Sequence, residues 1–157
     1  MLKSRTVVLT AAAFGLAGAA LAQVAPALAP KEAVAQRRDA YRETGSAFKT
    51  IRDQLASPTP LKIMLRTSIR RIQATARDQY AWFPAGSGPE IALETRAKAE
   101  IWTDPSTFHG AQTNFQKQAD LMAQAIDAGD APAMQVQAKA LGDACAACHD
   151  KFRAPED

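Results

Sequence analysis

Between residues 34 and 55, inward-facing positions recur at intervals that alternate between three and four residues without interruption. Side chains three and four apart share one face of a helix, so this spacing is the seam of a left-handed helical bundle. The members of the seam are Val34, Arg37, Tyr41, Thr44, Phe48, Ile51 and Leu55. A helix with such a seam is expected to pack lengthwise against other helices.

Proline and glycine divide the chain after the N-terminal region into four helical segments. Their predicted ranges are residues 30–55, 61–81, 105–128 and 131–152. The connections between the first and second and between the third and fourth are short, which makes those pairs antiparallel. The sequence therefore predicts an all-α fold, an up-down-up-down four-helix bundle. The long connection over residues 85–103 is of a length that is usually functional or disordered, with some helical turn around residues 91–98.

Aspartates, prolines and a glycine mark the ends of the last two segments. Asp104 is the predicted N-cap of the third, with Pro105 in the first helical position, and Gly129 closes that helix. Asp130 is the predicted N-cap of the fourth, with Pro132 in its first turn.

Each of the last three segments carries an apolar stripe at helical spacing. The stripes are Leu61, Leu65, Ile69, Ile72, Ala76 and Tyr80 in the second, Phe108, Ala111, Phe115, Ala119, Met122 and Ile126 in the third, and Met134, Ala138, Leu141, Cys145, Cys148 and Phe152 in the fourth. Two cysteines thus stand in register with the inward face of the fourth helix.

The two cysteines belong to the run Cys145-Ala-Ala-Cys148-His149. In a chain that carries an export signal, C-x-x-C-H is typical of a site for covalent attachment of haem c. The thiols form thioethers with the porphyrin vinyl groups, and the adjacent imidazole becomes the proximal iron ligand. Because the stripe faces inward, the haem is expected inside the bundle.

Three other interpretations of the motif stay open. A thioredoxin-like redox pair needs a βαβ setting, which the sequence does not indicate. A structural zinc site normally needs four ligands, and His109 is the one further soft ligand in the sequence. A disulfide across two residues within a helix would strain its geometry.

Residues 1–22 have the pattern of a cleaved signal peptide. Lys3 and Arg5 precede an almost wholly apolar stretch over residues 7–19, and residues 20–22 form an A-x-A cleavage site after Ala22. The apolar stretch is shorter than the ~20 residues that span a bilayer. Residues 27–29 are a second candidate cleavage site, disfavoured because Pro30 would follow the cut. We expect a periplasmic protein whose single domain covers residues 23–157.

Cleavage would lower the formal net charge of the chain from +3 to +1, because it removes two cations and no anion. Two haem propionates would make the sum slightly negative. The basic character of the uncleaved chain is therefore no argument for nucleic-acid or membrane binding.

The sequence resembles the cytochrome c′ family, which also holds the cytochromes c-556. The resemblance covers essentially the whole mature chain. It is carried by residues 145–153 around the haem motif, residues 99–105 (Ala-Glu-Ile-Trp-Thr-Asp-Pro) and residues 36–41 (Gln-Arg-Arg-Asp-Ala-Tyr). Ala99 departs from the family, which often has proline at that place.

In the family, an inward residue of the first helix decides the sixth iron position. The resemblance places Tyr41 there, and a phenol is a poor ligand for ferrous iron. The first helix contains neither Met nor His. Met64, Met122, Met134 and His109 are weaker candidates for a sixth ligand.

The resemblance also implies other haem contacts. Arg37 interrupts the apolar seam, and a buried charge needs a partner, for which a haem propionate is suited. Arg38 is a second candidate contact, and Thr95 and Glu100 are carried over from the segment that crosses the haem edge. Arg153 is expected beside His149, where it would tune the imidazole; the alternative is an ordinary cation favoured by the helix dipole at the C-terminal turn.

A vacant sixth position in an apolar cavity is expected to bind NO and CO but little O₂, which is helped by a distal donor. The predicted function is a gas-binding haem protein with possible electron transfer. The alternative is a low-spin six-coordinate carrier of the c-556 type. No acid–base pair for peroxide cleavage is recognisable, so no enzyme is expected. The redox partner is unknown. The family implies a possible homodimer through the first two helices. The outer faces there carry cations that could oppose association or simply be a solvated face: Lys62, Arg66, Arg70, Arg71 and Arg77.

Overall fold

The computed structural model describes residues 28–91 and 95–155. The expected signal peptide, residues 1–22, and its cleavage site after Ala22 lie outside these described residues. Within the described part, no helix is both long enough and apolar enough to cross a bilayer.

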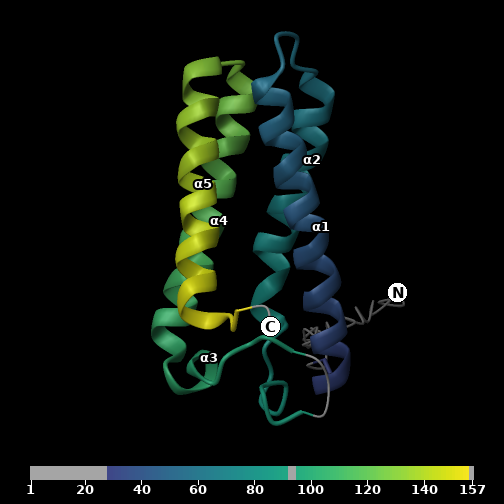
Figure 1. Ribbon diagram of the computed structural model, residues 1–157, viewed down its shortest axis with the longest axis vertical. Helices are drawn as coiled ribbons and strands as arrows, with labels where there is room; N and C mark the ends of the chain where they lie inside the picture. Colours follow the sequence, from purple (N-terminus) through teal and green to yellow (C-terminus); the bar gives the residue numbers. More distant parts are fainter. Residues whose placement is uncertain (1–27, 92–94, 156–157) are drawn as a thin grey trace, which may run out of the picture.

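Four long helices run along the long axis of the molecule (Figure 1). They are α1 (Pro30–Ala56), α2 (Lys62–Asp78), α4 (Pro105–Ala128) and α5 (Ala131–Phe152). A 3₁₀ turn, η1 (Gln79–Ala81), extends α2, and the short α3 (Glu100–Thr103) precedes α4. In Figure 1, α1 lies beside α2 and α4 beside α5, with each pair antiparallel. The predicted all-α four-helix bundle is confirmed.

The ends of α4 and the start of α5 are set by capping residues next to them in the sequence. Asp104 caps α4 by accepting a hydrogen bond from the Thr107 backbone N–H, and Asp130 caps α5 by accepting one from Ala133. Gly129 ends α4 in the left-handed region at φ 72°, where glycine has no Cβ penalty. The caps predicted from the sequence are therefore confirmed.

Most of the apolar stripes meet in one core, which we call the main cluster. It holds residues from all four long helices: Ala47, Ile51, Leu65, Ile69, Ile72, Ala76, Phe115, Ala119, Met122, Ala125, Ile126, Met134, Ala138 and Leu141. Cys145 packs against its edge.

A smaller core, the aromatic cluster, lies near α3. Ile101, Phe108 and Phe152 are buried in it, and Phe83, Trp102 and Cys148 are among the side chains that pack against it. The rings of Phe83 and Phe152 each meet Phe108 edge to face, with centroid separations of 4.7 and 5.0 Å.

A backbone clasp joins the end of α5 to the segment before α3. Lys98 N–H donates to the Phe152 carbonyl at 3.0 Å, and Ala154 N–H donates to the Arg96 carbonyl at 2.7 Å. Ala97 and Arg153 form an isolated antiparallel bridge between these hydrogen bonds.

The second predicted stripe is wrong at both ends. Leu61 is 58% exposed because it precedes α2 at the end of the bundle, and Tyr80 is 38% exposed. Tyr80 lies in η1, whose tighter winding changes the angle between successive side chains, so Gln79 turns inward instead. The expected helical turn around residues 91–98 lies partly outside the described residues. Its described part, residues 91 and 95–98, is not helical, and the short helix α3 follows at Glu100.

Candidate functional site

Cys145 and Cys148 lie on the inward side of α5, both half-buried and both free thiols. Residues three apart share a helix face, which is why both follow Leu141 in the apolar stripe. Burial raises the pKa of the Cys145 thiol to about 11 and also raises that of Cys148. Both cysteines are therefore neutral thiols near pH 7.

His149 follows directly, in the last turn of α5. Desolvation lowers the pKa of its imidazole, and the positive charges of Arg153 and Arg96 lower it further. The neutral imidazole, which is the form that binds a metal ion, is thus favoured. The Arg153 backbone N–H donates to the His149 carbonyl at 2.9 Å, which closes the helix beside the imidazole.

These residues fit a covalently bound haem. Two reduced thiols share one helix face, and a neutral imidazole adjoins the second of them. Within residues 28–91 and 95–155, no group of three or more His, Cys, Asp or Glu side chains could hold a metal ion by itself. The zinc interpretation gains no further ligands there.

Tyr41 of α1 lies within electrostatic reach of both cysteines. Burial raises the pKa of its phenol, and Cys148, Arg37 and Cys145 perturb that pKa in decreasing order. The Tyr41 ring meets the ring of Trp82 edge to face, with centroids 5.8 Å apart. Its hydroxyl donates to Gln79 Oε1 at 3.0 Å. The structure therefore brings Tyr41 and the motif to one region between α1 and α5.

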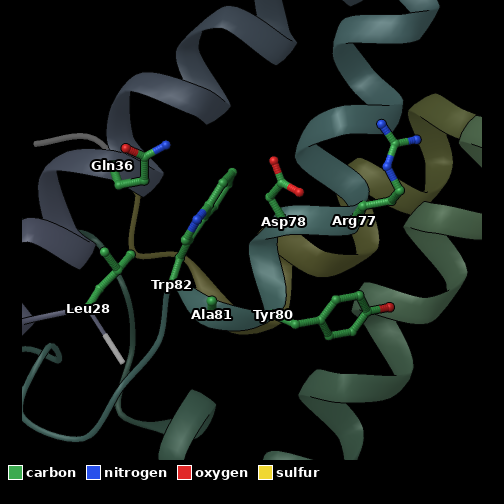
Figure 2. Close-up of a pocket in the computed structure, with 7 residues that line it drawn as sticks. All are labelled: Leu28, Gln36, Arg77, Asp78, Tyr80, Ala81 and Trp82. Carbon is green, nitrogen blue, oxygen red and sulfur yellow. The ribbon is translucent and has the colours of Figure 1, made fainter. Parts of the chain in front are cut away.

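Figure 2 shows a surface pocket of about 500 Å³ beside Trp82. Trp82 lines the pocket and also packs against Tyr41. The lining residues are Leu28, Gln36, Arg77, Asp78, Tyr80, Ala81 and Trp82.

Arg37 is buried, as its place in the seam predicts, with 3% of its surface exposed. Its Nη1 donates to the Trp82 carbonyl at 3.1 Å and to Ser87 Oγ at 3.0 Å. Its Nη2 donates to the Ser87 carbonyl at 2.6 Å and to Thr95 Oγ1 at 2.8 Å. The guanidinium also lies 4.8 Å from the centroid of the Phe83 ring. Arg37 therefore ties α1 to the connection before α3, and the predicted propionate contact stays a prediction.

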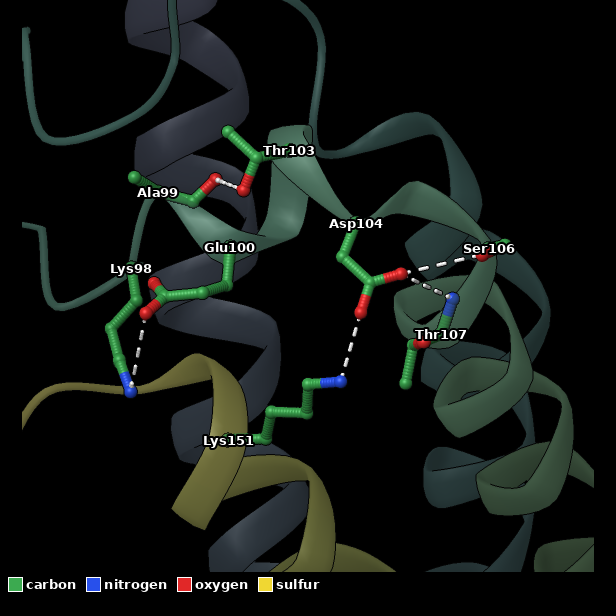
Figure 3. A network of polar contacts seen from close by, with 8 residues as sticks. All are labelled: Lys98, Ala99, Glu100, Thr103, Asp104, Ser106, Thr107 and Lys151. Atoms are coloured by element: carbon green, nitrogen blue, oxygen red, sulfur yellow. Dashed lines mark hydrogen bonds and ion pairs between the residues drawn. The ribbon is translucent and has the colours of Figure 1, made fainter.

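The other residues that the resemblance implied are placed unevenly. Thr95 is brought to Arg37, and Arg153 lies close enough to lower the pKa of His149. Arg38 is exposed on α1. Glu100 is exposed at the start of α3, with Oε1 3.8 Å from Lys98 Nζ (Figure 3).

The same view shows Asp104 between its capping contacts and Lys151 of α5. Lys151 Nζ donates to Asp104 Oδ2 at 2.9 Å. This contact and the Thr107 hydrogen bonds lower the pKa of Asp104 to about 2. The pair joins the start of α4 to the turn of α5 that carries His149.

The alternative candidates for a sixth iron ligand lie outside the region between Tyr41 and the motif of residues 145–149. Met64 is 42% exposed in the first turn of α2, at the end of the bundle opposite the last turn of α5 (Figure 1). Met122 and Met134 are buried in the main cluster. His109 is exposed, and its ring lies 5.4 Å from that of Tyr80.

Three buried polar residues near Tyr41 and Arg37 belong to no sequence motif, and the sequence alone does not identify them: Gln79, Ser87 and Gln112. Gln79 Nε2 donates to the Gln112 carbonyl at 3.3 Å, and Gln112 Nε2 donates to the Gln79 carbonyl at 3.4 Å. A glutamine at the end of a helix has no periodic signal of burial, because the 3₁₀ turn changes the phase of the pattern.

Comparison with known proteins agrees with this geometry. The family model described as Cytochrome C′ matches residues 32–153. The chain is 30% identical over 139 residues to cytochrome c′ of Rhodospirillum rubrum, which covers 88% of this chain and 93% of that protein. It is 29% identical over 124 residues to cytochrome c′ of Pararhodospirillum photometricum, covering 79% and 98%.

Solved structures show the same arrangement of helices. The crystal structure of cytochrome c′ from Thermochromatium tepidum superposes with a TM-score of 0.77 at 25% identity, covering 83% of this chain and 100% of that one. A nitric oxide complex of a cytochrome c prime variant from Alcaligenes xylosoxidans superposes with a TM-score of 0.72 at 25% identity, covering 81% and 97%.

Proposed function

The chain belongs to the cytochrome c′ family, and from that premise we propose that it is a periplasmic c-type haem protein whose five-coordinate iron binds NO and CO. The observation that carries this proposal is the position of Tyr41. It is the α1 side chain whose pKa responds to both Cys145 and Cys148.

Cys145 and Cys148 would hold the haem by thioether bonds, and His149 would be the proximal ligand. The bound haem supplies a redox-active iron that binds diatomic ligands. The domain that carries it is the proposed mature chain, residues 23–157. Its export rests on the sequence pattern of residues 1–22.

On the opposite face, Tyr41 would occupy the place of a sixth ligand without binding iron. Because burial raises the pKa of the Tyr41 phenol above its ordinary value of ~10, the phenol stays protonated at neutral pH and is a poor ligand for ferrous iron. Small neutral molecules can enter beside such a side chain, whereas a second protein ligand is lacking on α1, which contains no Met and no His.

The nitric oxide complex of the Alcaligenes xylosoxidans relative supports the NO part of the proposal. Electron transfer remains a second role of the same iron. A homodimer through α1 and α2 is proposed on the family resemblance. In that region Arg66 Nη2 pairs with Asp127 Oδ1 at 2.8 Å, so this cation is already partly compensated.

Optical spectra of the purified holoprotein test the proposal. We expect a high-spin ferrous spectrum that changes on addition of CO. A low-spin spectrum that is indifferent to CO would contradict it, and would indicate a c-556-type carrier.

A matched pair of variants sharpens the test. Tyr41→Met places a thioether at the proposed distal position and is expected to convert the ferrous spectrum to low spin. Met64→Leu alters a methionine at the other end of the bundle and is expected to leave the spectrum unchanged. A low-spin wild type that becomes high spin in Met64→Leu would refute the assignment of Tyr41.

A further inference from the structure

The side-chain amide of Gln79 has its orientation fixed by its surroundings. Gln79 is 3% exposed, and its Nε2 donates to the Ala76 carbonyl at 3.1 Å and to the Gln112 carbonyl at 3.3 Å. Backbone carbonyls only accept hydrogen bonds. If the amide were turned over, its Oε1 would face both carbonyl oxygens, and none of these three acceptors would have a donor. Buried acceptors without donors are costly in a low-dielectric interior.

The fixed amide in turn fixes the direction of the hydrogen bond to Tyr41. Gln79 Oε1 can only accept, so the Tyr41 hydroxyl must donate to it across their 3.0 Å separation. A phenol has one proton. Once that proton is held by Gln79, the hydroxyl can offer other neighbours only the lone pairs of its oxygen.

We propose that Gln79 is a positioning residue that decides ligand selectivity, because it directs the Tyr41 proton away from the space opposite His149. This inference rests on the proposed function, in which that space receives the iron's sixth ligand. An iron-bound O₂ is stabilised by a distal hydrogen-bond donor, and CO and NO do not need one. Gln79 thereby makes a tyrosine, which elsewhere could donate, behave as an acceptor toward a bound gas.

The chain offers a matched control for Gln79. Gln112 is also buried, at 5% exposure, and its Nε2 donates to the Gln79 backbone carbonyl at 3.4 Å. Its side chain does not touch the Tyr41 hydroxyl through any hydrogen bond within the described residues. Gln112→Leu therefore removes a buried amide from the same region and leaves the acceptor of Tyr41 in place.

The first readout is the C–O stretching band of the ferrous CO complex. A donor near the ligand oxygen lowers this frequency. Gln79→Leu releases the phenol proton, so its band is expected at lower wavenumber than that of the wild type. Gln112→Leu keeps the oxygen acceptor of Tyr41 and is expected to show the wild-type band. In a Tyr41→Phe background, Gln79→Leu is expected to have no effect, and a persisting shift would overturn the proposal.

The second readout is independent of ligand binding. The ultraviolet resonance Raman difference between wild type and Tyr41→Phe isolates Tyr41 from Tyr80, which donates to Gln116 Oε1 at 3.0 Å. The wild-type difference is expected to show a donating phenol, and Gln79→Leu to lose that signature. An accepting or unbonded phenol in the wild type overturns the proposal, even if Gln79→Leu fails to fold.

The two readouts separate the two possible failures. A protein that binds no CO but shows a donating Tyr41 would refute the proposed function and leave the hydrogen-bond direction intact. A protein that binds CO, and whose band does not move in Gln79→Leu, would refute the role of Gln79 alone.

Discussion

The main cluster and the end of the bundle that holds Tyr41 and Cys148 are built from different interactions. Every residue of the main cluster is apolar, and its members come from all four long helices. At the end that holds Tyr41 and Cys148, which we call the polar end, buried polar side chains make directed hydrogen bonds between α1, η1, α4 and the connection before α3. These side chains are Arg37, Gln79, Ser87 and Gln112.

Because of this difference, we expect the main cluster to determine the stability of the fold and the polar end to determine the orientation of the side chains at the site. Apolar burial is non-directional and roughly proportional to area, so it stabilises a fold without fixing any one atom. A satisfied polar network fixes the orientation of each member. Substitutions in the main cluster should therefore change the free energy of unfolding, and substitutions in the polar end should change the spectra of the site.

The largest effect is expected from removing the two cysteines of the proposed haem attachment site. The double variant Cys145→Ala, Cys148→Ala is expected to lose all covalently bound haem, because no thioether can form. Acid–acetone extraction of the purified protein measures this, with Met64→Leu as the control that retains its haem. Haem that stays with the double variant after extraction would contradict the assignment.

Truncating the main cluster should affect stability alone. Ile51 is fully buried, and Ile51→Ala is expected to lower the free energy of unfolding by about 2–5 kcal/mol through lost burial and a cavity. Chemical denaturation followed by far-ultraviolet circular dichroism measures the loss. The CO spectrum should match that of the wild type, and a shifted band would show that the two regions are not separable.

Arg37→Met should loosen the polar end. It removes four hydrogen bonds from a buried guanidinium, and part of that loss is offset because a buried charge is removed as well. We expect a net destabilisation of about 2 kcal/mol, together with faster hydrogen exchange in residues 86–91.

Arg37→Lys is the matched control, since it keeps the charge but not the planar set of donors. An intermediate exchange rate is expected for it. Equal exchange in all three proteins would show that Arg37 does not hold this segment.

Two glycines with positive φ allow the same substitution, Gly→Ala, to be made at each end of the bundle. Gly129 and Gly86 have φ values of 72° and 78°, and an added Cβ would meet only ordinary contacts, at 3.9 and 3.7 Å. Each Gly→Ala change is expected to cost roughly 1–2 kcal/mol from the left-handed backbone. Both should lower Tm similarly, and only Gly86→Ala, next to Ser87, should move the CO band. A shift in Gly129→Ala would contradict the comparison.

The smallest effect is expected at acid pH. The pKa of Asp104 is lowered to about 2, below an unfolded value of ~3.9. The ionised carboxylate therefore stabilises the fold fully above about pH 4, and this stabilisation is lost as the pH falls through about 2.

Asp104→Asn keeps an N-cap but removes the ion pair with Lys151. Its Tm should fall less steeply than that of the wild type between pH 4 and pH 2. Parallel acid limbs in thermal melts would show that the pair contributes nothing.

Much of the fold was predictable because helix caps and seams are local. Asp104, Gly129 and Asp130 mark helix ends through contacts within a few residues, and the seam of α1 follows from spacing alone. The burial of Arg37 was also predictable from its position in that seam. The C-x-x-C-H motif identified the candidate site for a similar reason, since its spacing is a property of one helix.

The polar network could not be predicted because its partners are far apart in sequence. Arg37 bonds to Ser87, 50 residues away, and Gln79 to Gln112, 33 residues away. Helical periodicity also failed where the winding changes, at η1, which buries Gln79 and exposes Tyr80. The identity of Gln79 as the acceptor for Tyr41 therefore required the three-dimensional structure.

The backbone clasp between residues 96–98 and 152–154 has a mechanical consequence. It joins the turn that carries His149 to Thr95, and Thr95 accepts a hydrogen bond from Arg37 of α1. A displacement of the last turn of α5 would therefore be expected to act on the helix that carries Tyr41 through the few residues between these hydrogen bonds. The helices on either side of the proposed haem site are thus joined by a continuous set of backbone and side-chain hydrogen bonds, so a change at His149 would be expected to reach Tyr41 through bonded contacts.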